Sequence, residues 1–236
     1  MLLVWQAMSS AGHIDGDFLP APIDIARTGL GMMGDGMLYD AVLYSMTNTG
    51  IGFTIGAAGG ALTGLAVALT RLVRVATGPL IYALWTVPKI ALLPLFLIIF
   101  GFGAAPQICL IATSTYFLVL IPTIAAVASI PSSYRQAALC LGANRRQMVR
   151  HVLLPAALPQ IFIALRLASG AAVLVMVAAE FTQGDQGVGF LIWNSWSLLL
   201  TERMYVGIVT VSILGVVFTQ LVVMLGRRLT PWNEER

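Results

Sequence analysis

The chain has 236 residues, of which 58% are hydrophobic and only 10% are charged, with a formal net charge of +3. Soluble domains carry about 25% charged residues, so this composition excludes an ordinary water-soluble domain and indicates a protein built for lipid. One helical span of a bilayer takes about 20 apolar residues, which leaves room for five to six transmembrane helices. The apolar runs do not alternate with polar residues, which favours helices over a membrane barrel. The small net charge gives no reason to expect nucleic-acid binding.

The first 45 residues are predicted to hold no complete span. Residues 1–11 are apolar but too short to cross a membrane, so we interpret them as the end of a truncated first transmembrane helix. Residues 12–45 are rich in Gly, Pro and Asp and are expected to form a loop.

Five complete spans are predicted after this loop, so that residues 1–236 form a single all-α integral membrane domain. Their expected bounds are residues 48–70, 79–102, 106–128, 161–181 and 205–226. Between the last three lie a polar, basic segment at residues 129–160 and a glycine-containing connection at residues 182–204.

Arginines predict the orientation of the chain. Cytoplasmic loops of membrane proteins are enriched in Lys and Arg. If residues 129–160 are cytoplasmic, only Arg27 and Arg203 fall outside, together with the acidic residues of the first loop. The arginines that fall inside are Arg71, Arg74, Arg135, Arg145, Arg146, Arg150, Arg227, Arg228 and Arg236.

Glycines recur at every fourth position of the span at residues 48–70. They are Gly52, Gly56, Gly60 and Gly64. Small residues at this spacing share one helix face and let two membrane helices approach closely. We expect this face to pack either on another helix of the same chain or on a second subunit.

The span at residues 79–102 contains a candidate for the lining of a substrate pathway. Pro88 removes a backbone donor and should interrupt the helix, and Pro94 should do so again. Broken helices occur at membrane depth only beside protein or a water-filled cavity. We therefore expect Trp85, Pro88 and Lys89 to line the pathway, where a cationic Lys89 would favour anionic substrates.

Glu180 and Gln183 are further candidates for this lining, at the outer end of the span at residues 161–181. Ionisable groups are costly in hydrocarbon and usually face a cavity or the bundle interior. Arg166 cannot pair with Glu180 within the chain, because fourteen helical residues separate them by about 21 Å. The alternative for Glu180 is a hydrogen bond to the turn at residues 183–189.

The chain lacks the sequence patterns of the common catalytic sites. There is no GxxxxGK[ST] loop for ATP, no HExxH and no GxSxG. His13 and His151, the only histidines, are predicted on opposite sides of the membrane. We therefore predict no catalytic residue, no metal site and no cofactor bound by this chain, and the sequence argues against an enzyme.

Residues 134–155 resemble the cytoplasmic EAA motif of binding-protein-dependent ABC transporter permeases. The family pattern is Glu-Ala-Ala, three residues, Gly, nine residues, then Ile-x-Leu-Pro. This chain has Gln136-Ala137-Ala138, Gly142 and residues 152–155, Val-Leu-Leu-Pro, so that Gln replaces Glu and Val replaces Ile. Residues 87–95 and 178–189 are similar to the nitrate, sulfonate, taurine and thiamine-precursor branch of these permeases.

The resemblance implies a type I, MetI-like permease fold whose cytoplasmic coupling helix docks in a groove of a separate ATPase. Small residues at 136–138 suit a close fit, and Gly142 permits a tight turn with positive φ. The arginines offer a basic face for an acidic rim, or serve only as positive-inside anchors. The residues assigned to this contact are Arg135, Gln136, Ala137, Ala138, Gly142, Ala143, Arg145, Arg146, Leu154 and Pro155.

The same resemblance implies the partners and the location. Two ABC ATPase subunits would bind ATP and Mg, a second permease subunit would complete a homodimer, and a periplasmic or lipid-anchored substrate-binding protein would deliver the solute. The complex would lie in the lipid of the bacterial cytoplasmic (inner) membrane and import a small anionic or polar solute. Nitrate, a sulfonate, an aromatic carboxylate and a vitamin precursor all remain open.

Two other functions are compatible with a polytopic membrane protein. An ion-gradient-driven secondary carrier would need intramembrane carboxylates or proton relays in several spans, and here only Glu180 is available. A non-transporting membrane assembly protein would not need the pattern at residues 136–155.

Overall fold

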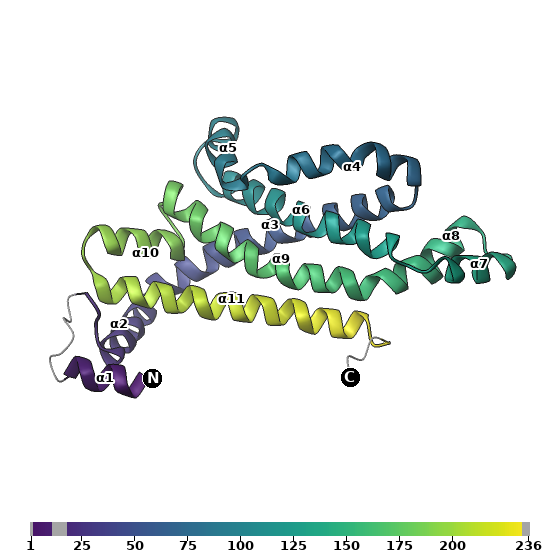
Figure 1. Ribbon diagram of the computed structural model, residues 1–236. Coiled ribbons are helices and arrows are strands. Elements are labelled where there is room, and N and C mark those ends of the chain that lie inside the picture. The colour runs from purple at the N-terminus through teal and green to yellow at the C-terminus, as the bar shows by residue number, and fades with distance from the viewer. Residues whose placement is uncertain (1, 11–17, 233–236) are drawn as a thin grey trace.

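The computed structural model of the chain describes residues 2–10 and 18–232. These residues form helices joined by turns, without a strand, and the long helices lie side by side in an elongated bundle (Figure 1). The elements are α1 (Leu2–Ser10), α2 (Pro22–Gly34), α3 (Met37–Ala68), α4 (Arg71–Thr86), the 3-10 turn η1 (Lys89–Leu92), α5 (Leu93–Phe100), α6 (Ala104–Ala128), α7 (Ser132–Cys140), α8 (Arg145–Met148), the π-helical η2 (Val149–Leu153), α9 (Leu154–Gln183), α10 (Val188–Ser197) and α11 (Thr201–Leu229).

Four helices of the described residues are long and apolar enough to cross a membrane. They are Met37–Ala68, Ala104–Ala128, Arg145–Thr182 and Thr201–Leu229. A bent pair, Arg71–Thr86 with Lys89–Phe100, gives a fifth candidate span whose two halves differ in direction by 83°. The prediction of an all-α membrane protein is confirmed.

Helix α6 is the centre of the core. It packs against α3 on one side and α9 on the other, and Leu110, Ile111 and Val119 on it are fully buried. The remaining long helix, α11, packs on α9 and α10. Much of α11 faces away from the bundle, as expected for a helix that contacts lipid or another subunit.

The glycine face of α3 lies against α6 of the same chain. A Cβ atom on Gly52 would lie 2.9 Å from the carbonyl oxygen of Ile108, and one on Gly64 would lie 2.8 Å from Cβ of Thr123. A Cβ on Gly56 or Gly60 would collide with a carbonyl oxygen of α6. The backbones of α3 and α6 are therefore too close for any larger residue at these positions.

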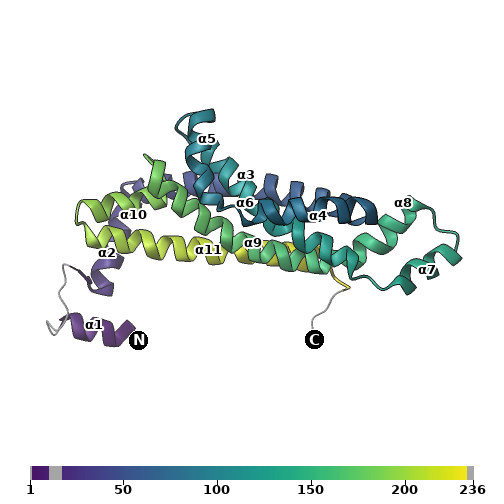
Figure 2. The same cartoon turned by 45° about the horizontal axis from the view of Figure 1, so that its top comes forward.

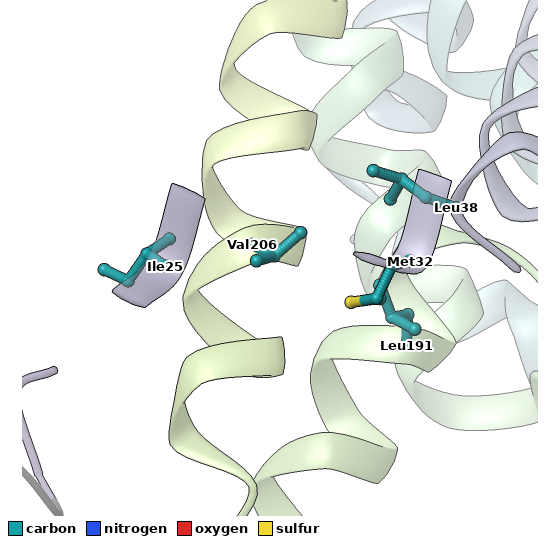
Figure 3. Packing of buried hydrophobic residues seen from close by; sticks show 5 residues of the cluster. All are labelled: Ile25, Met32, Leu38, Leu191 and Val206. Carbon is teal, nitrogen blue, oxygen red and sulfur yellow. The ribbon is translucent and has the colours of Figure 1, made fainter. Parts of the chain in front are cut away.

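The expected loop at residues 12–45 is wrong, because α2 and the beginning of α3 lie within it. Pro22 stands in the first turn of α2, where its missing N–H costs no hydrogen bond. Ile25 and Met32 are buried with Leu191 and Val206 (Figure 3). Helix α2 forms because α10 and α11 supply this apolar surface. Residues 11–17 lie outside the described residues.

The expected span at residues 79–102 is two helices rather than one. Helix α4 begins at Arg71 and continues through Pro79, which removes one hydrogen bond but does not end the helix. The break comes at Val87 and Pro88, both in extended conformation, where an interruption was predicted. Pro94 stands in the first turn of α5 rather than breaking it.

Two further boundaries differ from the prediction. The span expected at residues 161–181 begins earlier, at Leu154, and its helix continues back through η2 to Arg145. The connection expected at residues 182–204 contains α10, which has a buried face against α3, α9 and α11. Helices α7 and α8 lie at one end of the bundle and α10 at the other (Figure 2).

Candidate functional site

The predicted motif at residues 134–155 folds as a helical hairpin of α7 and α8. At the end of α7, the N–H of Gly142 donates to the carbonyl of Leu139 at 2.9 Å, and the N–H of Ala143 donates to that of Ala138 at 3.0 Å. These two bonds are the Schellman pattern, which places its penultimate residue in the left-handed region. Gly142 has φ of +77°. Nothing lies within 4 Å of the position of its Cβ, so the backbone alone requires glycine there.

Helix α8 starts directly after this turn with a reciprocal cap. The side chain of Asn144 accepts from the N–H of Gln147 at 2.9 Å, and the side chain of Gln147 accepts from the N–H of Asn144 at 2.9 Å. Two backbone donors that a helix start leaves unpaired are thereby satisfied. The turn between α7 and α8 is fixed by local bonds on both of its sides, so the hairpin has a defined shape.

A π-helical turn joins the hairpin to α9. The N–H of Leu154 donates to the carbonyl of Val149, five residues earlier. Pro155 has no N–H with which to continue the α-helical pattern. Such π turns are rare and occur mostly as single bulges within helices. Leu154 and Pro155 are half-buried there, beneath the hairpin rather than on its tip.

Half of the residues assigned to partner contact are exposed on the hairpin. Gln136 and Ala137 on α7, Gly142 in the turn, and Arg145 and Arg146 on α8 are exposed, while Ala138 and Ala143 are half-buried. Arg135 differs, because its Nη2 donates to the carbonyl of Val127 at 3.3 Å and ties α7 back to the end of α6.

The sequence reasoning missed three exposed apolar side chains of the hairpin. Tyr134 is 57% exposed, Leu139 62% and Leu141 88%. Exposed apolar side chains in a polar segment are candidates for a protein contact when they lie together on one surface. The signal was present in the sequence as leucines on both sides of Cys140, at the end of a segment that begins with polar residues.

The other end of the bundle holds a buried polar junction around Glu180. Its Oε1 accepts from Oγ of Ser45 on α3 at 2.7 Å and from Nε2 of Gln107 on α6 at 2.7 Å. Its Oε2 accepts from the backbone N–H of Gly189 on α10 at 2.7 Å. Glu180 is 1% exposed, so the carboxylate is packed between four helices.

This junction adjoins a cavity of about 240 Å³. Gln107 and Glu180 contribute to its wall, together with Tyr44 on α3 and Asp185 in the turn before α10. The hydrogen bond to Gly189 agrees with the alternative reading of Glu180, a contact with the turn at residues 183–189. Gln183 ends α9, but its side chain lies outside the described part of the structure.

Lys89 is placed at the break between α4 and α5. Its Nζ donates to the carbonyls of Leu84, Trp85 and Val87 at 2.7–2.9 Å. It also lies 4.8 Å from the ring centroid of Phe117. An ammonium group has three donors, so the carbonyls of the last turn of α4 and of Val87 already use all of them.

The structure does not bring the pathway candidates together at one point. Lys89 lies at the level of Phe117 on α6, whereas Glu180 bonds Gln107 on the same helix. These two α6 positions are ten residues apart, about 15 Å along a helix. Trp85 and Pro88 are exposed beside Lys89.

Comparisons with known proteins agree with this architecture. Residues 56–231 match the family described as binding-protein-dependent transport system inner membrane component. The putative aliphatic sulfonates transport permease protein of Bacillus subtilis (strain 168) is 30% identical over 99% of this chain and 84% of its own length. The taurine transport system permease protein of Escherichia coli (strain K12) is 32% identical over 100% of this chain and 87% of its own length. A structure of the inward-facing MetNI methionine ABC transporter matches 85% of this chain and 97% of that chain, with a TM-score of 0.68 at 22% identity.

Proposed function

The chain belongs to the family of binding-protein-dependent transport system inner membrane components, the permease subunits of ABC importers, and we propose that it carries small sulfonates delivered by a substrate-binding protein. As such a subunit it is a multi-pass membrane component that translocates a solute and is not itself an enzyme. The two relatives named above, at 30% and 32% identity, are named for aliphatic sulfonates and taurine, which supports a sulfonate as cargo.

The observation that carries the mechanism is the hairpin of α7 and α8, whose turn is held by local hydrogen bonds at one end of the bundle (Figure 2). In the proposed complex this end is cytoplasmic, and the hairpin docks in a groove of an ATPase subunit. Leu139 and Leu141 would enter the groove as apolar anchors, since they are the most exposed leucines of the hairpin. Arg145 and Arg146 would face an acidic rim of the same groove.

The transport cycle then follows from partner closure. Two ATPase subunits bind ATP and Mg, and their closure moves the hairpins of two permease subunits, here a homodimer. The pathway between the subunits switches from inward-facing to outward-facing, and the binding protein releases the solute into it. Hydrolysis resets the complex. The permease is a two-state element biased by a ligand bound to its partner.

The hydrogen bonds of Glu180 argue against the alternative function, an ion-gradient-driven secondary carrier. Such a carrier needs a carboxylate that exchanges an ion or a proton during the cycle. Both oxygens of Glu180 already accept bonds from Ser45, Gln107 and Gly189. An ion would have to displace packed protein donors to reach it.

Replacement of Gly142 tests the coupling assignment. Gly142→Val should abolish solute-stimulated ATPase activity and uptake in proteoliposomes while the protein still inserts, because a β-branched residue resists positive φ. Gly142→Asn should keep most activity, since Asn tolerates the left-handed region. Gly50→Val is the matched control, because the Cβ position of Gly50 has nothing within 4 Å and its φ is helical. Normal coupling in Gly142→Val would refute the assignment.

The cargo is tested on the substrate-binding protein that stimulates this permease complex. Its thermal unfolding should shift upward with taurine or an alkanesulfonate at micromolar to millimolar concentrations, because binding to the folded state stabilises it. Matched carboxylates and nitrate serve as comparisons. A shift with one of these, and none with any sulfonate, would reject the proposed cargo while leaving the permease assignment intact.

A further inference from the structure

The junction at Glu180 connects four helices through one side chain. Glu180 belongs to α9, and its three donors belong to α3, α6 and α10. Ser45 also accepts from the N–H of Val188 at 2.9 Å, which bonds α3 directly to α10. Asn48 donates to Oε1 of Gln107 at 2.9 Å, which bonds α3 directly to α6. All of these groups are buried.

The backbone beside the carboxylate is shaped for it. Gly187 has φ of +100°, and a Cβ there would collide with the carboxylate of Glu180. A Cβ on Gly189 would lie 2.7 Å from Cβ of Glu180. The two glycines let α10 start in contact with Glu180, where the first backbone N–H groups of a helix favour a negative group.

Helix α10 also makes apolar contacts with its neighbours. Val188 and Ile192 pack in an apolar cluster with Ala41 of α3, and Leu191 packs with Met32 of α2. Apolar contacts resist separation but permit sliding, whereas hydrogen bonds fix direction and register. The polar junction therefore supplies the directional part of the attachment.

We infer that Glu180 is a positioning residue that locks α10 to the ends of α3, α6 and α9, so that these four helix ends move as one body during transport. Glu180 acts through α10 and the helix ends rather than by touching the solute. This inference rests on the proposed function for its transport consequences, but its structural part stands on the hydrogen bonds alone.

The chemistry of the junction requires an acceptor at both oxygens. Ser45, Gln107 and Gly189 all donate, so Glu180→Gln would turn one NH₂ group toward a donor and lose at least one bond. Exchanging the two side chains, Gln107→Glu with Glu180→Gln, recovers the bonds to position 107 and to Gly189, and the Ser45 oxygen, which can no longer donate there, can accept from the new amide. The new carboxylate at position 107 accepts from the amides at 48 and 180, and the amide oxygen at 180 accepts from Gly189.

Hydrogen exchange of residues 184–198 in nanodisc-embedded permease tests the structural part. We expect exchange roughly tenfold faster in Glu180→Gln and in Gln107→Glu, as the loss of a bond to a charged group implies, and near wild type in the double exchange variant. Ser114→Ala is the matched control, because Ser114 is a buried α6 serine without a hydrogen-bond partner in the described residues. Should Glu180→Gln not insert, Ser45→Ala removes one bond to the carboxylate and one to Val188.

The same variants in the complete complex test the transport part. The single variants should lower the maximal uptake rate severalfold without moving the half-saturating concentration, and the double variant should recover it. A shifted half-saturating concentration would instead mark Glu180 as a solute contact and overturn the inference. The inference would also be overturned if hydrogen exchange of residues 184–198 were unchanged in Glu180→Gln, or if it were as fast in the double variant as in the single variants. Failure of the wild-type complex to transport sulfonates would count against the proposed cargo. The hydrogen-exchange result would still show whether Glu180 holds α10 in place.

Discussion

Two helix ends in this chain adopt the same turn with different residues. After α7 the left-handed position is held by Gly142, and after α10 it is held by Leu199, with φ of +58°. The bonds correspond, since Leu199 donates to Trp196 at 3.1 Å and Leu200 to Ser195 at 2.8 Å. A left-handed conformation costs a residue with a Cβ about 1–2 kcal/mol. The turn at Gly142 was predictable, because a glycine after a helix is a common signal for it. The turn at Leu199 was not predictable, because Leu199 stands in a run of three leucines that carries no such signal.

The strain at Leu199 gives a prediction of increased stability. Leu199→Gly should raise the free energy of unfolding by about 1 kcal/mol, because glycine adopts positive φ without strain and the side chain is 81% exposed. Leu198→Gly should lower the free energy of unfolding by a similar amount. Leu198 has φ of −95°, which leucine adopts without strain, so glycine there only increases the conformational entropy of the unfolded chain. Reversible unfolding in mixed micelles measures both, and equal effects of the two changes would contradict the account.

At the scale of elements, the helices that were predicted from the sequence are the long apolar ones that can span a membrane. The helices that were missed form by packing on segments far away in the sequence. The four-residue spacing of the glycines on α3 was visible in the sequence. The sequence did not show that this face packs on α6. Helices α2 and α10 were not predicted. Each of these helices has only a short apolar stretch in the sequence. Their buried residues, such as Met32 and Leu191, contact one another only in the folded chain.

Packing of α3 on α6 predicts a position-dependent effect of alanine. Gly56→Ala should destabilise the protein by about 1–3 kcal/mol, because its Cβ would collide with the carbonyl of Ala112 and the helices would have to separate. Gly50→Ala on the same helix has open space and should be neutral or slightly stabilising, since alanine favours helices. Thermal unfolding of the two variants measures the difference. Equal midpoints would rule out close packing at Gly56.

The bend between α4 and α5 predicts a role for Lys89 in holding the break. Lys89→Met removes a cation from three carbonyls at the end of α4 and should widen the distribution of distances between spin labels at Leu80 and Ile98, both exposed. Thr86→Val is the control, because the Thr86 hydroxyl bonds only within its own helix, to Ala83 at 2.8 Å. An unaltered distribution in Lys89→Met, with weaker binding of an anionic solute, would favour the pathway role first expected for this residue.

At the scale of the whole molecule, charges of opposite sign gather at opposite ends of the bundle. Asp40 in the first turn of α3 and Glu202 in the first turn of α11 lie at the α10 end, and Arg227 and Arg228 lie in the last turn of α11. Helix dipoles favour this arrangement by about 0.3–1 kcal/mol per charge. Arg71 lies in the first turn of α4, where the helix dipole disfavours a positive charge, so membrane orientation rather than helix electrostatics accounts for its position.

The charge distribution predicts which end is cytoplasmic, and the native cysteines allow a direct measurement. Cys140 is exposed at the end of α7, whereas Cys109 is half-buried in α6. A membrane-impermeant maleimide should therefore label Cys140 in inverted vesicles and leave it unlabelled in right-side-out vesicles. In a Cys140→Ser background, Asp35→Cys in the exposed turn between α2 and α3 should give the reverse result. Labelling of Cys140 from the outside would place the hairpin away from any ATPase. The proposed coupling would then fail even though the fold remained correct, because a hairpin can transmit nucleotide-driven closure only from the compartment that contains the nucleotide.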